Sequence, residues 1–225
     1  MISVENLSKQ FTLHILNDKC IEACRGISFS VPAGGFLGLA GPSGAGKSTV
    51  LKCIYRTYLP SGGAVRYDSA GYGTVDLTTL SDRRMIEIRT REIGYVSQFL
   101  KVIPRVSAVE VIMEPIIARN GVTREEARER AIGLLERLRI PRTLFDAYPS
   151  TFSGGEQQRI NIAHAIGWRP RLLLLDEPTA SLDRESVAIV KEMLRELRDE
   201  GTTMVGIFHD TELMESMTDS VYRVC

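Results

Sequence analysis

Polar and hydrophobic positions alternate along much of the first third of the chain, and this period of about two residues predicts β-strands. The strands are expected at residues 2–8, at about 20–31, and as a pair around turn residues within 64–78. Between them, the apolar run at 36–40 predicts a short buried strand, and a helix is expected over 47–55. The N-terminal third is therefore predicted to be mostly β-structure around one helix.

The middle of the chain changes to the period of about 3.6 residues that is typical of helices. Helices are expected over 81–91, 107–119 and 123–138. In the third of these, the apolar residues recur on one face, and Thr123 and Glu126 have the spacing of a capping box. This region is therefore predicted to be helical.

Buried-type strands and helices alternate again in the last quarter of the chain. Apolar runs at 171–176 and 203–208 predict strands, and the segments 183–199 and 210–217 predict helices. Alternation of this kind favours a mostly parallel sheet that binds its ligand at the carboxyl ends of its strands. The fold class is therefore predicted to be α/β.

The order of these elements predicts one domain, spanning 1–225, with an insertion. The core and a β-subdomain are expected at about 1–80 and 166–225, and a helical subdomain at about 81–165. The composition is compatible with this, because 44% hydrophobic and 25% charged residues exclude a disordered chain, a fibrous repeat and a small disulfide-stabilised scaffold.

Charge and targeting signals narrow the class of partner. Lys plus Arg and Asp plus Glu each number 28, so the formal net charge is zero, and no nucleic-acid partner is expected. No apolar segment approaches the roughly 18 residues that cross a bilayer, and the N-terminus lacks a signal-peptide pattern, which favours a cytoplasmic location. The four cysteines form no CxxC pair and are expected to be reduced thiols.

The segment GPSGAGKS at residues 41–48 fits the pattern of a phosphate-binding loop. Glycines let the backbone wrap a polyphosphate closely, and the helix that follows adds the positive end of its dipole. We expect Lys47 to reach the β- and γ-phosphates and Ser48 to bind Mg²⁺. A chance glycine-rich turn is the alternative, but the strand before it and the helix after it favour nucleotide binding. The residues expected to contact the nucleotide are Gly41, Ser43, Gly44, Ala45, Gly46, Lys47, Ser48 and Thr49.

A second motif consists of an apolar strand that ends in two carboxylates, Asp176 and Glu177. A buried carboxylate costs several kcal/mol unless it is paired or binds a cation. We expect Asp176 to hold Mg²⁺ through its water shell and Glu177 to polarise the attacking water. A solvated acidic turn is the alternative, and the phosphate loop upstream favours the functional interpretation.

A third motif, FSGGEQQR at residues 152–159, opens a helix. Ser153 and Glu156 have capping-box spacing, which accounts for these two residues. It does not account for Gly154 and Gly155, since each glycine inside a helix costs about 1 kcal/mol relative to alanine. Close approach of an anion to the helix N-terminus is expected to explain the glycines.

Together these motifs resemble the ATP-binding cassettes of ABC proteins over essentially the whole chain. GPSGAGKS looks like the Walker A loop, LLLLDE like Walker B, and FSGGE like the signature usually written LSGGQ. Gln98 in GYVSQ resembles the Q-loop glutamine, His209 the switch histidine, and Asp183 in SLD the D-loop aspartate. Phe11 in LSKQF lies where the family places an aromatic ring that stacks on adenine. Taken alone, such a glutamine is more often a surface amide, such a phenylalanine a core residue and such a histidine a structural one, and each becomes functional only through the family resemblance.

The resemblance implies a P-loop NTPase fold: an ABC ATPase core with an antiparallel β-subdomain and an inserted α-helical subdomain. It implies ATP and Mg²⁺ as cofactors, and ATP hydrolysis by Glu177, His209 and Gln98, with Gln98 also reaching the metal beside Ser48 and Asp176. One phosphate loop and one signature per chain imply a head-to-tail homodimer that encloses two ATP molecules. The residues implied on the signature side of each nucleotide are Ser153, Gly154, Gly155 and Glu156, with Asp183 of the D-loop.

The segment at residues 94–106, with TFSGGEQQRINIAHAI and FHDTE, resembles the cassette subunits of the phosphonate carbon–phosphorus lyase system. That resemblance implies association with the soluble complex of phosphonate catabolism, at the step that forms ribose 1-phosphonate 5-triphosphate. The alternative is the ATPase subunit of a lipoprotein- or macrolide-exporter-type transporter, whose partner is a membrane permease. A nucleotide kinase is an alternative of a different class, but such an enzyme needs no signature helix.

Overall fold

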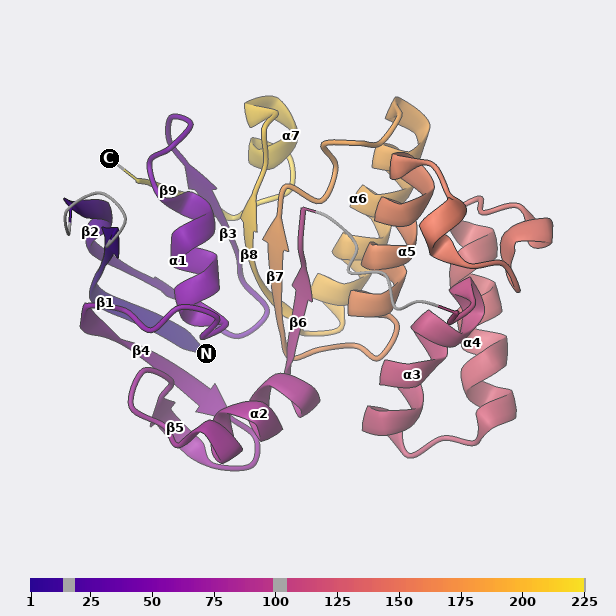
Figure 1. Cartoon of the computed structure of the whole chain (residues 1–225), viewed down its shortest axis with the longest axis horizontal. Helices are drawn as coiled ribbons and strands as arrows, with labels where there is room; N and C mark the ends of the chain where they lie inside the picture. The colour runs from indigo at the N-terminus through magenta and orange to yellow at the C-terminus, as the bar shows by residue number, and fades with distance from the viewer. Residues whose placement is uncertain (14–18, 99–104, 225) are drawn as a thin grey trace.

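The computed structural model describes residues 1–13, 19–98 and 105–224. Two sheets form its centre: a four-stranded sheet in the order β2-β1-β4-β5 and a five-stranded sheet in the order β6-β7-β8-β3-β9. Figure 1 shows helix α1 (Lys47–Ile54) between the two sheets, and the helices of residues 108–199 on the far side of the five-stranded sheet. The predicted α/β architecture is confirmed by this arrangement.

The four-stranded sheet is antiparallel throughout. It consists of β1 (Ile2–Leu13), β2 (Lys19–Val31), β4 (Gly62–Ser69) and β5 (Gly73–Asp76). The predicted strands are confirmed, and the first two are longer than expected because they continue as a hairpin whose register shifts at bulges. This hairpin lies over α1, which carries the phosphate loop at its N-terminus.

The five-stranded sheet is parallel. It consists of β3 (Phe36–Ala40), β6 (Ile93–Val96), β7 (Leu172–Asp176), β8 (Thr203–Ile207) and β9 (Ser220–Arg223). Because parallel strands run in one direction, all their carboxyl ends meet at one edge, where the sequence motifs follow β3, β6, β7 and β8. The short, mixed segment that forms β9 had not been predicted as a strand.

The apolar runs of β7 follow from burial on both faces. Leu172 and Leu174 belong to the hydrophobic core shared with α1, whereas Leu173 and Leu175 belong to the core shared with the helices on the other face. That other face is covered by α6 (Arg184–Asp199) and α7 (Thr211–Glu215). The sheet is therefore held between two separate cores.

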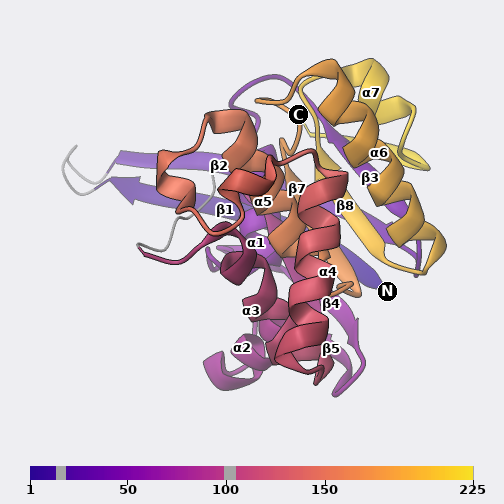
Figure 2. The same cartoon turned by 90° about the vertical axis from the view of Figure 1, so that its right-hand side faces the viewer.

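The inserted helices are α3 (Ala108–Asn120), α4 (Arg124–Arg137) and α5 (Gly154–Ile166), with short 3-10 turns at Arg142–Leu144 and Pro149–Thr151. Figure 2 shows these three helices side by side in front of the sheet. The capping box expected at the start of α4 is confirmed by hydrogen bonds in both directions between Thr123 and Glu126.

The first helix of the segment expected to be the helical subdomain packs against the α1 core. Helix α2 (Asp82–Arg91) buries Met85 and Ile88 in the core that contains α1 and the antiparallel sheet. Strand β6 then pairs with β7 at the edge of the parallel sheet. The helical period of 81–91 predicted the type of element correctly, but it carries no information on what that element packs against.

Across residues 1–13, 19–98 and 105–224, no helix has both the length and the apolar character needed to cross a bilayer. Cys20, Cys24 and Cys53 carry free thiols, as expected. Burial raises the pKa of the Cys53 thiol to about 12, which keeps this buried side chain unreactive. Cys225 lies outside the described residues.

Candidate functional site

The phosphate loop joins the end of β3 to the start of α1, as the motif predicts. Gly46 caps α1 with φ 86°, and a Cβ there would lie 1.9 Å from the carbonyl oxygen of Ala23 in β2. Gly44 also has a positive φ, 83°, but no atom lies within 4 Å of its would-be Cβ. Gly46 is thus required by the neighbouring strand, and Gly44 by its own backbone conformation.

The side chain of Lys47 folds back over this loop. Its ammonium donates to the carbonyl oxygens of Gly41, at 2.7 Å, and Pro42, at 2.8 Å. The positive charge therefore stays beside the loop, and a phosphate that enters the loop competes with two carbonyl groups for it.

Two of the three residues expected to bind magnesium, Ser48 and Asp176, come together. The Ser48 hydroxyl donates to Oδ1 of Asp176 at 2.7 Å, and Asp176 is only 5% exposed. Oxygen atoms from a hydroxyl and a carboxylate are the ligands that Mg²⁺ prefers, so the side chains fit this ion. A third side chain joins them, because the Tyr95 phenol donates to Oδ2 of Asp176 at 2.9 Å. Tyr95 was absent from the sequence prediction.

Glu177, the predicted catalytic carboxylate, adopts an unusual backbone conformation. Its φ is 53°, in the left-handed region that side chains other than glycine seldom occupy. Its amide donates to the carbonyl of Ile207 in β8 at 3.0 Å, which holds the bend directly after β7. Strain of about 1–3 kcal/mol at one residue is characteristic of functional sites.

Gln98 and His209 follow the strands on either side of β7. Val96 of β6 pairs with Leu175, and Asp176 pairs with Ile207 of β8, so the three strands end in register. Both side chains are exposed at this edge. The structure therefore places the glutamine, the carboxylate pair and the histidine at neighbouring strand ends.

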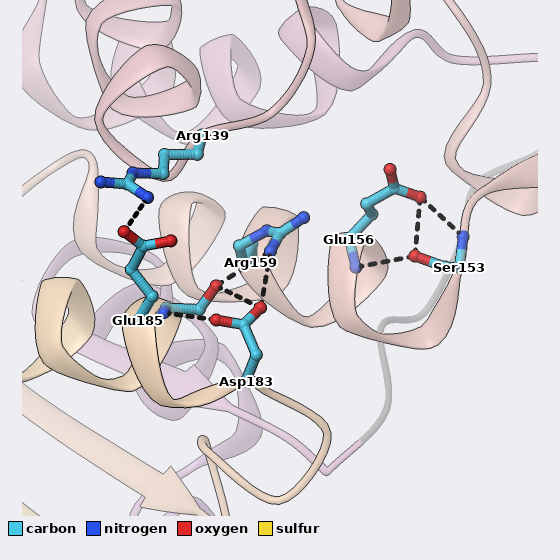
Figure 3. A network of polar contacts seen from close by, with 7 residues as sticks. Arg139, Ser153, Glu156, Arg159, Asp183 and Glu185 are labelled. Atoms are coloured by element: carbon cyan, nitrogen blue, oxygen red, sulfur yellow. Dashed lines mark hydrogen bonds and ion pairs between the residues drawn. The ribbon is translucent and has the colours of Figure 1, made fainter.

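The tip of α5 is closed by a complete capping box (Figure 3). The Ser153 hydroxyl donates to Glu156 Oε2 at 2.7 Å and accepts from the Glu156 amide at 3.4 Å. The Ser153 amide donates to the same carboxylate at 2.9 Å. The hydrogen bond from the hydroxyl is the main reason why the pKa of Glu156 lies below its usual range. The helix-cap explanation of this pair is confirmed.

The two glycines after Ser153 have different causes. A Cβ on Gly155 would lie 3.0 Å from the carbonyl oxygen of Ser181, so this glycine is needed within the chain itself. A Cβ on Gly154 would meet no atom within 4 Å. The chain itself thus gives a reason for Gly155 and none for Gly154, and approach by an anion stays a prediction for both.

Asp183 serves as the N-cap of α6. It accepts from the Ser186 amide at 2.8 Å and from the Ser186 hydroxyl at 3.0 Å, and these bonds lower its pKa. Arg159 of α5 lies 3.7 Å from the same carboxylate (Figure 3), and a further ion pair joins Arg139 to Glu185. Asp183 is thus tied to helix α5.

Two buried amide side chains that contact the site's loops, Gln158 and Asn161, were missed by the sequence analysis. Gln158, 3% exposed, donates to the carbonyl of Pro178 at 3.1 Å. Asn161 donates to the carbonyl of Ser97 at 2.7 Å and to Gln158 at 3.3 Å. They link α5 to Pro178, which follows the two carboxylates, and to Ser97, which precedes Gln98. Their signal in the sequence is a pair of amides three residues apart among apolar residues.

Phe11 lies on the hairpin that touches the phosphate loop. It pairs with Ile21 of β2, two residues from Ala23, whose carbonyl approaches Gly46. The half-buried ring meets Tyr58 edge-on at 5.1 Å between centroids, and the Lys9 ammonium lies 4.8 Å from its centroid. This position is compatible with the expected adenine contact. Residues 14–18, which follow in the hairpin loop, lie outside the described residues.

Comparison with known proteins assigns the family. A family model described as "ABC transporter" matches residues 24–180, more than half of the chain. The chain belongs to the ABC transporter family of ATP-binding cassettes. The matched part of this cassette includes the phosphate loop, the tip of α5 and the pair Asp176 and Glu177. The cassette therefore binds ATP together with Mg²⁺.

Several relatives cover nearly all of the cassette. A "Probable amino-acid ABC transporter ATP-binding protein" of Haemophilus influenzae is 33% identical over 222 residues, which are 98% of this chain and 82% of the relative. The "L-cystine import ATP-binding protein TcyC" of Bacillus subtilis is 32% identical over 98% of this chain and 85% of its own. The "Macrolide export ATP-binding/permease protein MacB" of Syntrophobacter fumaroxidans is 37% identical over 96% of this chain, which spans only 29% of that longer protein.

Solved structures confirm the predicted P-loop ABC fold. The dimeric structure of a post-hydrolysis state of the ATP-binding cassette MJ0796, bound to ADP and Pi, has a TM-score of 0.89 at 29% identity. It covers 100% of this chain and 94% of its own. A second dimeric structure of MJ0796, described as a bacterial ABC transporter cassette, matches equally well at 30% identity.

Proposed function

We propose that this cassette hydrolyses ATP to ADP and phosphate at the carboxyl edge of its parallel sheet. The observation that carries the proposal is the meeting of Ser48, from the phosphate loop, with Asp176, from the end of β7. These two side chains would hold Mg²⁺, which neutralises charge on the β- and γ-phosphates. Lys47 exchanges its two carbonyl partners for phosphate oxygens as the nucleotide enters.

The attacking water requires a base, and Glu177 is the carboxylate beside this site. In our proposal its carboxylate orients the water and takes its proton as the γ-phosphoryl group leaves ADP. His209, after the neighbouring strand, binds a γ-phosphate oxygen, and Gln98 senses the metal and the γ-phosphate from the other side. The bend at Glu177, with φ 53°, supports a specialised role for this residue.

A second copy of the chain completes each site in our proposal. In Figure 1 the N-terminus of α1 and that of α5 lie along the same edge of the molecule, with strands β3, β8 and β7 between them. A two-fold rotation can bring the α5 tip of one protomer over the phosphate loop of the other, twice in one dimer. Ser153, Gly154 and the helix dipole would then meet the γ-phosphate. The dimeric structures of MJ0796 support this arrangement.

The substitution Glu177→Gln tests the catalytic assignment. We expect nucleotide binding to stay within about twofold of wild type, while hydrolysis falls by about 10²- to 10⁴-fold, as for loss of a general base. Steady-state phosphate release and titration with a fluorescent ATP analogue measure the two quantities. Glu200→Gln, at an exposed ion pair at the end of α6, is the matched control and keeps the wild-type rate. Near-normal hydrolysis by Glu177→Gln would contradict the assignment.

For the output of hydrolysis we propose the soluble complex of phosphonate catabolism, at the step that forms ribose 1-phosphonate 5-triphosphate. The support is the sequence resemblance of segments 94–106, 151–166 and 208–212. In the first segment, residues 99–104 lie outside the described residues. The structure describes 94–98, which include the end of β6 and Gln98, and 105–106.

Transport is the second candidate function, because the relatives named above are ATP-binding proteins of amino-acid import and macrolide export systems. In that case the partner is an integral membrane permease. The two candidates are separated by affinity purification of the tagged chain from its own cells, with and without detergent. Recovery of soluble phosphonate-lyase subunits without detergent supports the first, and recovery of a permease from the detergent extract supports the second.

A deletion strain gives an independent readout. If the cassette serves phosphonate catabolism, the strain loses growth on an alkylphosphonate as the only phosphorus source and grows normally on inorganic phosphate. Normal growth on the phosphonate contradicts the proposed output but leaves the ATPase proposal unaffected.

A further inference from the structure

The Asp176 carboxylate is held on both of its oxygens. Oδ1 accepts from the Ser48 hydroxyl at 2.7 Å, and Oδ2 accepts from the Tyr95 phenol at 2.9 Å. The two donors come from different elements, α1 and β6, on either side of the acid at the end of β7. A carboxylate with one donor on each oxygen is fixed in orientation. Because Asp176 is only 5% exposed, these two donors take the place of water around it.

Tyr95 is itself fixed by its surroundings. Its ring stacks on Tyr55, with 4.9 Å between centroids and 20° between planes. Tyr55 is the residue that ends α1, the helix that begins with Lys47 and Ser48. The Arg89 guanidinium lies 4.2 Å from the centroid of the Tyr55 ring. Helix α1 thus contacts Asp176 directly at one end and through Tyr95 at the other.

The phenol of Tyr95 remains a hydrogen-bond donor over the working pH range. Burial raises the pKa of Tyr95 well above its ordinary value, and the negative charge of Asp176 raises it further. The phenol therefore keeps its proton and donates it to the carboxylate in the hydrogen bond of 2.9 Å.

The chain contains a second buried contact between a phenol and a carboxylate, which serves as a comparison. The Tyr67 phenol donates to Glu92 at 3.0 Å. Glu92 also accepts from the Ser69 hydroxyl at 2.7 Å and pairs with Arg171 at 3.4 Å. That cluster joins the antiparallel sheet to the opposite, amino-terminal end of the parallel sheet, far along the strands from the phosphate loop. It is a structural contact with the same chemistry.

We infer that Tyr95 is a positioning residue for magnesium binding: it holds the Asp176 carboxylate with Oδ1 directed at Ser48, so that both ligand groups are in place before nucleotide arrives. The inference rests on the proposed assignment of Asp176 and Ser48 to Mg²⁺. Hydrogen-bonding partners of metal ligands typically change metal affinity by about 10- to 100-fold when removed. Tyr95→Phe removes only the hydroxyl and keeps the ring that stacks on Tyr55.

The experiment measures binding of the non-hydrolysable analogue AMP-PNP to the whole chain by calorimetry, once in EDTA and once in excess Mg²⁺. The ratio of the two affinities is the gain from magnesium. We expect this ratio to be about tenfold smaller for Tyr95→Phe than for wild type, while the affinity in EDTA stays at the wild-type value. Tyr67→Phe, the matched control, keeps the full gain. Asp176→Asn, which removes the proposed ligand, loses it.

The outcomes separate this inference from the proposal beneath it. If Asp176→Asn loses the gain and Tyr95→Phe keeps it within about twofold, the inference fails and the magnesium assignment stands. If Asp176→Asn keeps the gain, the magnesium assignment itself fails. Loss of EDTA affinity in Tyr95→Phe also overturns the inference, because it means that the phosphate loop has been damaged.

A second variant keeps the test valid if Tyr95→Phe does not fold. Tyr55→Leu leaves the phenol in place and removes the ring stacked on it, a contact whose loss corresponds to about a threefold change. We expect a loss of about threefold in the gain from magnesium. An unchanged gain in a folded Tyr55→Leu protein contradicts the inference.

Discussion

Replacing Ser153 with alanine separates the structural role of the α5 tip from its proposed role in binding phosphate. The structure supplies a control, because α4 begins with the same motif. Ser153 and Glu156 form one capping box, and Thr123 and Glu126 form the other. Both N-cap residues, Ser153 and Thr123, are exposed, so the two alanine substitutions remove nearly the same contacts.

The distances indicate that the two caps are of similar strength. In α5 the hydroxyl accepts from the Glu156 amide at 3.4 Å and donates to its carboxylate at 2.7 Å. In α4 the corresponding distances, to Glu126, are 3.3 Å and 3.0 Å. Loss of an N-cap residue costs about 1 kcal/mol. For a domain of this size that corresponds to a decrease in Tm of about 2–4 °C, the same for both variants.

ATP hydrolysis is expected to distinguish the two variants. A hydrogen bond to a charged group contributes about 1.5–3 kcal/mol, so Ser153→Ala should hydrolyse ATP at least about tenfold more slowly than wild type. Thr123→Ala, in which only the cap is lost, keeps the wild-type rate. Circular dichroism during heating and steady-state phosphate release, both at one protein concentration, give the two quantities.

Equal hydrolysis by the two variants at equal Tm would refute the reasoning. The α5 tip would then be an ordinary helix N-terminus, and Gly154 would have no assigned ligand. A decrease in Tm confined to Ser153→Ala would refute the comparison itself, because it would show that the two caps contribute differently to the free energy of unfolding.

Two further predictions concern stability. Gly46→Ala should lower the free energy of unfolding by at least about 3 kcal/mol, because its φ is 86° and its Cβ would collide with the Ala23 carbonyl. Gly44→Ala, whose Cβ would enter open space, should lower it by only about 1–2 kcal/mol. Urea denaturation of the two variants measures both values. Desolvation lowers the pKa of His164 in the folded state, so stability should decrease as the pH falls below its unfolded pKa of about 6.5. His164→Gln should flatten that dependence, and equal slopes in the wild-type and His164→Gln proteins would contradict the assignment.

The elements that sequence periodicity predicted best are those whose burial repeats regularly. Helix α4 buries Ala127, Ala131 and Leu135 on one face, and β7 is apolar throughout because both of its faces are covered. Strand β9 has neither signal, since its four residues are mixed and mostly exposed. The position of α2 was missed because periodicity identifies a helix without naming the surface that it covers.

The site was predictable where its residues are adjacent in the sequence, and not where the sheet brings distant residues together. The motifs singled out Lys47, Ser48 and the pair Asp176 and Glu177. Tyr95 was not, because its contact with Asp176 depends on β6 lying beside β7 in the sheet. The positive φ of Glu177 likewise depends on how the chain leaves β7, and the residue types in this segment do not predict that conformation.

The glycines of the α5 tip show the same limit. Two helix-destabilising glycines in one turn indicated a close approach, and one was found for Gly155. The atom that approaches Gly155 in the structure is the carbonyl oxygen of Ser181 in the same chain. Sequence identifies that space is needed at such a position, but only the packing shows which group occupies it.

The central claim, that each ATP site is built from two chains, is tested most directly by mixing two inactive variants. Glu177→Gln removes the proposed base. Gly154→Glu adds a carboxylate at the α5 tip, where the chain itself leaves open space, so the fold tolerates it while a γ-phosphate is repelled. In a mixed dimer one site carries both changes and the other carries neither. We predict that an equal mixture recovers about one quarter of the wild-type hydrolysis rate, because about half of the dimers are mixed and each has one intact site. If the mixture remains as inactive as its components, each chain encloses its own nucleotide and the account is contradicted.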